Sequence, residues 1–224
     1  MKMSKGLFVI TMLATLFFTS CSEFNNIIKS GDYLYRYEAA KQYYADGKYT
    51  RAVVLLQDVI SVLKGTDKGE ESLYLLGISA YKARDYEAAA NFLKKYYETY
   101  TNGLYTQDAR FYNAMALYKN TPEPKLDQTE TYEAVTAFQN LLEIFPQSIY
   151  AKESQDMIFK LQDKLVEKEY LSAKTYFDLG SYFGNCNFGG NNYQACIITA
   201  ENAMRDYPYS KRREDFAIML LRVK

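Results

Sequence analysis

Aromatic and basic side chains recur at a fixed interval in this chain, and they are its main candidates for binding chemistry. Two sets repeat with a step of 37 residues, namely Tyr37, Tyr74 and Phe111, and Tyr44, Tyr81 and Tyr118. Lys82 and Lys119 each directly follow a member of the second set. Aromatic rings give a large contact area at low entropic cost, and a lysine can bind a carboxylate or a backbone carbonyl. The pattern is typical of a surface that binds an extended or aromatic-ended peptide.

Catalysis has little support in the composition. The chain has no His, which excludes imidazole acid–base catalysis, Ser-His-Asp triads and His metal sites. Gly189-Gly190 is not followed by Lys-Ser/Thr, so a phosphate-binding loop is not supported. Lys plus Arg and Asp plus Glu both number 27, so no net charge attracts nucleic acid. We expect a protein that is not an enzyme, with no cofactor, no metal and no nucleic-acid partner.

The residues around these aromatics predict helix hairpins. In 70–100, apolar residues recur at steps of three and four, stop at 83–85 and resume at Tyr86, which predicts two amphipathic helices. Gly77 and Ala89 mark places where helix backbones can approach closely. This unit resembles one tetratricopeptide repeat (TPR), which cannot bury its apolar face alone. We predict an all-α fold, a right-handed solenoid of TPR hairpins, with the aromatic sets on its concave side. The alternative is that the rings pack between repeats.

Further repeats follow in the same register. Ala40 and Ala114 lie 37 residues before and after Gly77. The third repeat carries an eight-residue insertion within 120–130, where its prolines cannot continue a helix. Such an insertion can carry partner contacts or be a tolerated surface loop. We expect an N-terminal half at 33–149 with three repeats.

The C-terminal half is expected at 150–224. Residues 150–179 contain no Gly or Pro and predict one long helix, which precedes a fourth repeat and the start of a fifth. Cys196 takes the small-residue position of the fourth repeat, and Cys186 lies on the loop before it. The two could pair in oxidising surroundings, or Cys196 could simply pack as a small apolar residue.

The first 20 residues predict a signal peptide. Lys2 and Lys5 precede an apolar run at 7–18 that is too short to span a bilayer. The residues leading to Cys21 resemble a bacterial lipobox, although Phe18 stands where leucine is usual. A lipobox implies cleavage before Cys21 and attachment of acyl chains such as palmitate there, and two or more chains anchor a protein stably. Residues 21–32 would then be a lipidated tether. An ordinary secretory signal with a chance cysteine is the alternative.

The order of these features resembles the BamD family of lipoproteins, which belong to the β-barrel assembly machinery. The resemblance rests on the lipobox, the early first repeat, the long helix and two similar junctions, Phe145-Pro146-Gln147-Ser148 and Tyr207-Pro208-Tyr209-Ser210. It implies a lipid anchor on the periplasmic face of the outer membrane and binding of unfolded outer-membrane β-barrel proteins. It also implies docking on a BamA-like barrel subunit through the later repeats, beside other lipoproteins of the machinery. The insertion near Pro122 and the loop near Gly189 depart from the family.

Two other functions stay open from the sequence. A glycan-capturing outer-membrane lipoprotein also uses helical repeats and aromatic side chains, although it usually carries long insertions. A TPR scaffold for cell-wall synthesis or division is the other possibility. The partner that copurifies with the protein would distinguish these functions.

Overall fold

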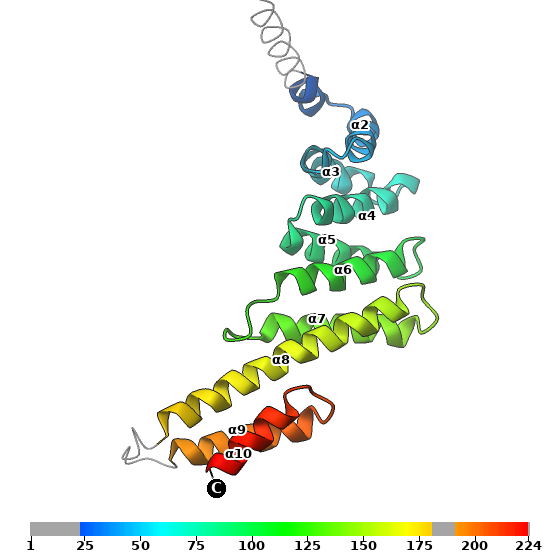
Figure 1. The fold of residues 1–224 in the computed structure, drawn as a ribbon. Coiled ribbons are helices and arrows are strands. Elements are labelled where there is room, and N and C mark those ends of the chain that lie inside the picture. Colours follow the sequence, from blue (N-terminus) through cyan, green and yellow to red (C-terminus); the bar gives the residue numbers. More distant parts are fainter. Residues whose placement is uncertain (1–22, 181–190, 224) are drawn as a thin grey trace, which may run out of the picture. The chain divides into compact units, whose positions relative to one another are not determined.

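The computed structural model describes residues 23–180 and 191–223, and its long regular elements in those ranges are all α-helices (Figure 1). The helices are α2 (Tyr33–Ala45), α3 (Tyr49–Leu63), α4 (Asp67–Lys82), α5 (Tyr86–Thr99), α6 (Thr106–Asn120), α7 (Thr129–Ile144), α8 (Ala151–Leu179), α9 (Asn192–Asp206) and α10 (Arg213–Val223). Within each unit, helices that follow one another pack against each other, which confirms the all-α fold built from TPR-type units. The predicted signal peptide, Cys21 and Cys186 lie outside the described residues.

The described chain divides into two compact units, one ending at Ala109 and the other beginning at Arg110. The first unit contains the hairpins α2–α3 and α4–α5. The second contains α7 to α10, and α8 packs against both α7 and α9. The halves expected from the sequence meet at 149 and 150 instead, at the start of this long helix.

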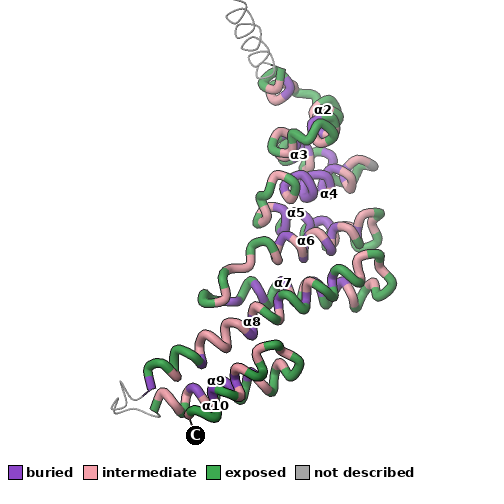
Figure 2. The backbone as a smooth tube through the Cα atoms, viewed as in Figure 1, coloured by how far each residue is buried: buried purple, intermediate pink, exposed green. Residues whose placement is uncertain are grey.

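The small residues that set the predicted register are all buried. They are Ala40, Gly77 and Ala114 in the first helices of the hairpins, and Ala52, Ala89, Ala134 and Cys196 in the second helices. At Gly77, an added Cβ would lie 2.7 Å from the Leu93 Cγ atom, so α4 and α5 approach more closely than a larger side chain would allow. Figure 2 shows that buried positions dominate α4. The close approach inferred from the sequence is confirmed.

The hairpin turns of the first unit repeat in detail. The Tyr44 ring meets the Tyr49 ring edge-on at 5.5 Å, and Tyr81 meets Tyr86 in the same way at 5.6 Å. Gly47 takes a left-handed backbone conformation with φ +73°, and Arg84 takes it with φ 66° at the equivalent place. The turn therefore requires positive φ whichever residue occupies it.

Substitutions in these two turns should have opposite effects. Gly47→Ala is expected to lower the free energy of unfolding by about 1 kcal/mol, because a Cβ is disfavoured at positive φ. Arg84→Gly removes that strain from the folded state. Glycine also raises the conformational entropy of the unfolded chain, but this offsets at most part of the gain, so the variant should not be destabilised. Urea denaturation of both variants measures the difference. Equal losses in the two variants would contradict this account of the turn.

The segment before α2 differs from the expected tether. Residues 23–29 form a short helix, and the Phe24 ring packs edge-on against the Tyr43 ring at 5.5 Å. Ile27 is buried, and an Arg36 guanidinium nitrogen donates a hydrogen bond to the Ile28 carbonyl. The segment is polar on average, but Phe24 and Ile27 share one helix face, and Phe24 packs beside the turn of the first hairpin.

The predicted long helix is confirmed as the 29-residue α8. Its first half contributes Ile158 and Leu161 to a core with α7, which also contains Phe138 and Leu141. Its second half contributes Val166 and Ala173 to a separate core with α9 and α10, and the buried Cys196 belongs to this core. One helix thus serves two successive cores. Gly180, with φ +41°, ends it.

The eight-residue insertion folds back onto α8. The Gln128 side chain is buried and donates hydrogen bonds to the carbonyls of Glu123 and Leu126 at 2.8 and 3.1 Å. The Lys164 ammonium donates to the Thr121 hydroxyl at 2.6 Å, and Lys168 donates to the Leu126 carbonyl at 2.7 Å. Burial lowers the pKa of Lys164. Side chains of α8 therefore hold the loop in place.

Candidate peptide-binding site

The first aromatic set is covered by side chains from the next repeat. The Tyr74 ring stacks on Tyr105 at 4.3 Å, with an interplanar angle of 4°. Phe111 stacks on Tyr150 at 4.1 Å, with an angle of 9°. The Lys68 ammonium lies 4.9 Å from the centre of the Tyr37 ring.

These contacts leave little of the first set for a ligand. Tyr37 is 1% exposed and Phe111 is 4% exposed, whereas Tyr74 is half-buried. Tyr37 and Phe111 therefore pack between repeats, which is the alternative that the sequence left open. A peptide surface has to be built from the other predicted residues.

A similar contact recurs later in the second unit with different chemistry. Arg212 lies over the Tyr170 ring, with its Cζ atom 4.2 Å from the ring centre. Its guanidinium also donates to both carboxylate oxygens of Glu167, at 2.8 and 3.0 Å, and to Asp215 at 2.8 Å. The side chains that lie over Tyr37, Tyr74, Phe111 and Tyr170 are thus Lys68, Tyr105, Tyr150 and Arg212, respectively. The sequence did not reveal this series, because its members differ in type.

Two glutamates at the start of α4 accept hydrogen bonds from buried tyrosines. The Tyr37 hydroxyl donates to Glu71, which also pairs with the Lys41 ammonium at 2.8 Å. Burial and the hydrogen bond to Glu71 raise the pKa of Tyr37 to about 12. The Tyr96 hydroxyl donates to Glu70 at 2.6 Å. Burial, and to a smaller extent this hydrogen bond, also raises the pKa of Tyr96. Both carboxylates thus connect α4 to tyrosines of the neighbouring helices and support the fold.

The second aromatic set remains partly accessible. Tyr44, Tyr81 and Tyr118 are half-buried, each in the last turn of the first helix of its hairpin. Lys82 and Lys119 are exposed, and the Lys119 ammonium lies 5.6 Å from the centre of the Tyr118 ring. In the first unit, Tyr44 and Tyr81 are held by the edge-on contacts described above. Each position thus combines a half-buried ring with, at Tyr81 and Tyr118, a lysine as the next residue, and the ring is held by a second aromatic at Tyr44 and Tyr81.

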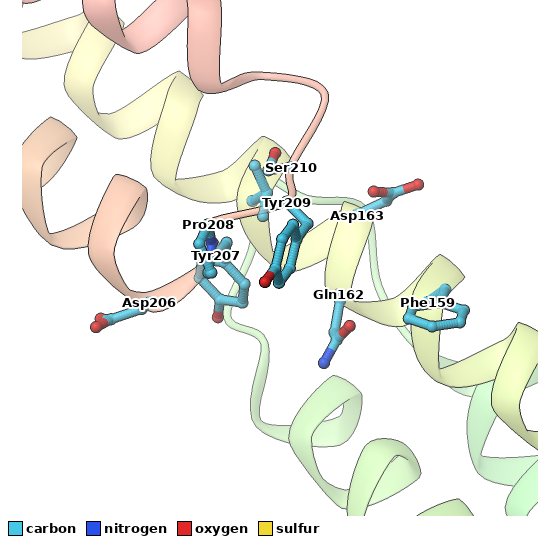
Figure 3. Close-up of a pocket in the computed structure, with 9 residues that line it drawn as sticks. Phe159, Gln162, Asp163, Asp206, Tyr207, Pro208, Tyr209 and Ser210 are labelled. Atoms are coloured by element: carbon cyan, nitrogen blue, oxygen red, sulfur yellow. The ribbon is translucent and has the colours of Figure 1, made fainter.

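A cleft in the second unit was not predicted. It lies between α8 and the turn that joins α9 to α10 and has a volume of about 200 Å³. Phe159 is 56% exposed at its edge and Tyr209 is 98% exposed. Figure 3 shows the Tyr209 ring facing the space beside Phe159 and Gln162 of α8. Burial and a hydrogen bond with Tyr132 raise the pKa of the neighbouring Tyr207.

The predicted lipidation site, Cys21, lies outside the described residues. Within 23–180 and 191–223, none of the helices is both long enough and apolar enough to traverse a bilayer.

Comparison with known proteins finds a similar sequence and a similar solved structure. The chain is 26% identical over 171 residues to a putative outer membrane protein assembly factor BamD of Aquifex aeolicus (strain VF5), an alignment covering 75% of this chain. The chain spans 56% of that relative's length. A solved structure, a thermophilic TPR protein of Thermus thermophilus, is 18% identical with a TM-score of 0.40, covering 85% of this chain and 100% of that one.

A family model is matched over most of the chain. The YfiO model, described as "outer membrane lipoprotein", aligns with residues 32–222, which include α2 to α9 and all but the last residue of α10. The chain therefore belongs to the YfiO family of outer membrane lipoproteins.

Proposed function

We propose that the protein is a non-catalytic scaffold of the outer-membrane β-barrel assembly machinery, anchored by lipid at Cys21 to the periplasmic face of the membrane. It binds segments of unfolded barrel proteins at the second aromatic set and docks on a BamA-like barrel subunit through its later repeats. Family membership and the relative named as an assembly factor support the general role.

One observation carries the peptide-binding part of the proposal. In the first unit, the half-buried Tyr81 and the exposed Lys82 are consecutive residues in the last turn of α4. The Tyr86 ring holds Tyr81 in place at 5.6 Å, so ordering the ring costs little further entropy on binding. An aromatic residue at the end of a barrel strand would contact the ring, and the terminal carboxylate would pair with the ammonium.

A peptide from the C-terminal strand of an outer-membrane barrel protein tests this site. The free-acid peptide should bind the purified chain more tightly than the same peptide with an amidated end. Lys82→Glu should weaken binding of the free-acid peptide about tenfold, because it replaces attraction of the carboxylate with repulsion. Fluorescence anisotropy gives the affinities. Lys94→Glu on α5 is the matched control, because Lys94 is also exposed and lies away from Tyr81 in sequence.

Two results would count against peptide binding at this site. Equal affinity for the acid and amide forms would remove the carboxylate from the proposal. Equal weakening by Lys82→Glu and Lys94→Glu would indicate only a general charge effect.

Depletion of the protein in cells tests the general role. Levels of folded barrel proteins in the outer membrane should fall, and a BamA-like subunit should copurify with the tagged chain. Normal barrel levels after depletion would refute the assembly role. Copurification with polysaccharide or division proteins would favour the other functions that the sequence left open.

A further inference from the structure

The middle of α8 exposes a large aromatic residue where earlier first helices carry a small one. A small buried residue lies 14 positions after the last residue of α3, at Gly77, and 14 positions after Tyr100, at Ala114. Counting 14 positions from Phe145, which follows α7, leads to Phe159, which is 56% exposed. Phenylalanine at this position is too large for the close helix approach seen at Gly77.

The second helix that would cover this position packs further along α8. The small buried residue of α8 that packs with α9 is Ala173, which lies 14 residues after Phe159. Fourteen residues of helix span about 21 Å and return to nearly the same face, about 40° away. Val166, seven residues after Phe159, already belongs to the core with α9 and α10, so about two turns of α8 remain without the second helix that covers this face in the regular repeats.

The exposed stretch of α8 has a mixed apolar and acidic surface. Asp156 and Asp163 lie three residues before and four residues after Phe159, so all three share one face of the helix. Asp163 lines the cleft together with Tyr209 and with Asp206. Asp206 pairs with Arg205 at 3.0 Å, whereas neither Asp156 nor Asp163 has an ion pair within the described part of the chain.

We infer that this cleft binds an amphipathic helix of a partner protein, with an apolar side chain held between Phe159 and Tyr209 and with Lys or Arg facing Asp156 and Asp163. A helix fits because this face of α8 corresponds to the one that takes a second helix in the regular repeats. The basic character follows from complementarity to the rim carboxylates. The inference rests on the proposed docking through the later repeats and specifies its chemistry.

Two synthetic helical peptides of equal length test the inference. They share one apolar face, and the flanking positions are Lys in one and Glu in the other. The Lys peptide should bind the full chain at least about tenfold more tightly than the Glu peptide in fluorescence anisotropy. Phe159→Ala should weaken the Lys peptide by a similar factor, since it removes a central aromatic contact. Asp163→Lys should reverse the preference between the peptides.

Ile198→Ala is the matched control, because Ile198 is 53% exposed on α9 and does not line the cleft. It should leave both affinities unchanged, and circular dichroism should show that all variants fold. Failure of the Lys peptide to bind, equal binding of both peptides, or insensitivity of the Lys peptide to Phe159→Ala would overturn the inference. If a BamA-like subunit still copurifies with the Phe159→Ala variant, the proposed docking stands but its assignment to this cleft is wrong. If no BamA-like subunit copurifies with the unmodified chain, the proposed docking itself is wrong.

Discussion

Gly77→Val is expected to lower the free energy of unfolding by about 3 kcal/mol, near the upper end of the usual cost of overpacking. An added Cβ would lie 2.7 Å from both Cγ and Cδ2 of Leu93 and 3.2 Å from the Leu93 backbone nitrogen. The side chain of Leu93 can rotate away only within a core where it is itself fully buried. Urea denaturation monitored by circular dichroism measures the loss.

A double variant separates this clash from a general effect of valine in a helix. Leu93→Ala alone should cost about 2–5 kcal/mol, because it leaves a cavity in the same core. In Gly77→Val/Leu93→Ala the new side chain fills part of that cavity, so the combined loss should fall below the sum by about 2 kcal/mol. Gly31→Val, which lies before α2, is the control for the added side chain alone, since nothing lies within 4 Å of a Cβ at Gly31. Simple addition of the two losses would contradict the proposed contact between α4 and α5.

The parts of the fold that the sequence predicted correctly depend on local spacing. Gly77 and Ala89 are small, and bulky residues follow them at helical intervals, so both hairpin helices and their contact could be inferred within one repeat. The length of α8 followed from the absence of Gly and Pro between 150 and 179. In each case a short stretch of chain contains the whole physical cause.

The parts that it did not predict depend on partners far away in the sequence. Tyr37 and Phe111 resemble groove residues until Lys68 and Tyr150 are seen to cover them, and those partners lie 31 and 39 residues further on. The insertion likewise resembles a projecting loop, because Lys164, which holds Thr121, is 43 residues away. Sequence spacing identifies the helix face of an aromatic residue, but it does not show what covers that face.

The candidate site shows the same limit. Tyr81 and Lys82 could be identified from the sequence because they are adjacent in it. The cleft beside Phe159 could not be identified, because Tyr209 reaches it from a turn 50 residues later. One signal was available: a Phe occupies the position at which the 14-residue count leads to a small residue in earlier repeats. Such an exception to a repeat pattern is a useful indication that the helix contacts something other than the next repeat.

Alkaline pH should unfold the chain through its buried tyrosines. The unfolded chain releases a phenol proton near pH 10, whereas folded Tyr37 keeps its proton to about pH 12. The stabilisation linked to this proton is complete below pH 10 and is lost as the pH rises towards 12, at a cost of about 2–3 kcal/mol from Tyr37 alone. Tyr96 and Tyr207, whose pKa values are also raised by burial, should add to the loss.

Substitution of Tyr37 tests the contribution of this single proton. In Tyr37→Phe the free energy of unfolding at neutral pH should fall by about 1–2 kcal/mol, because Glu71 loses a hydrogen bond in a partly buried place. The decline between pH 10 and 12 should then become shallower, since the group that titrates there is gone. Tyr209→Phe is the control, because its ring is 98% exposed and solvated in both states. Urea titrations at a series of pH values, with tyrosinate absorbance followed in parallel, measure both effects. A decline of unchanged slope in Tyr37→Phe would show that the hydroxyl held by Glu71 does not control alkaline stability.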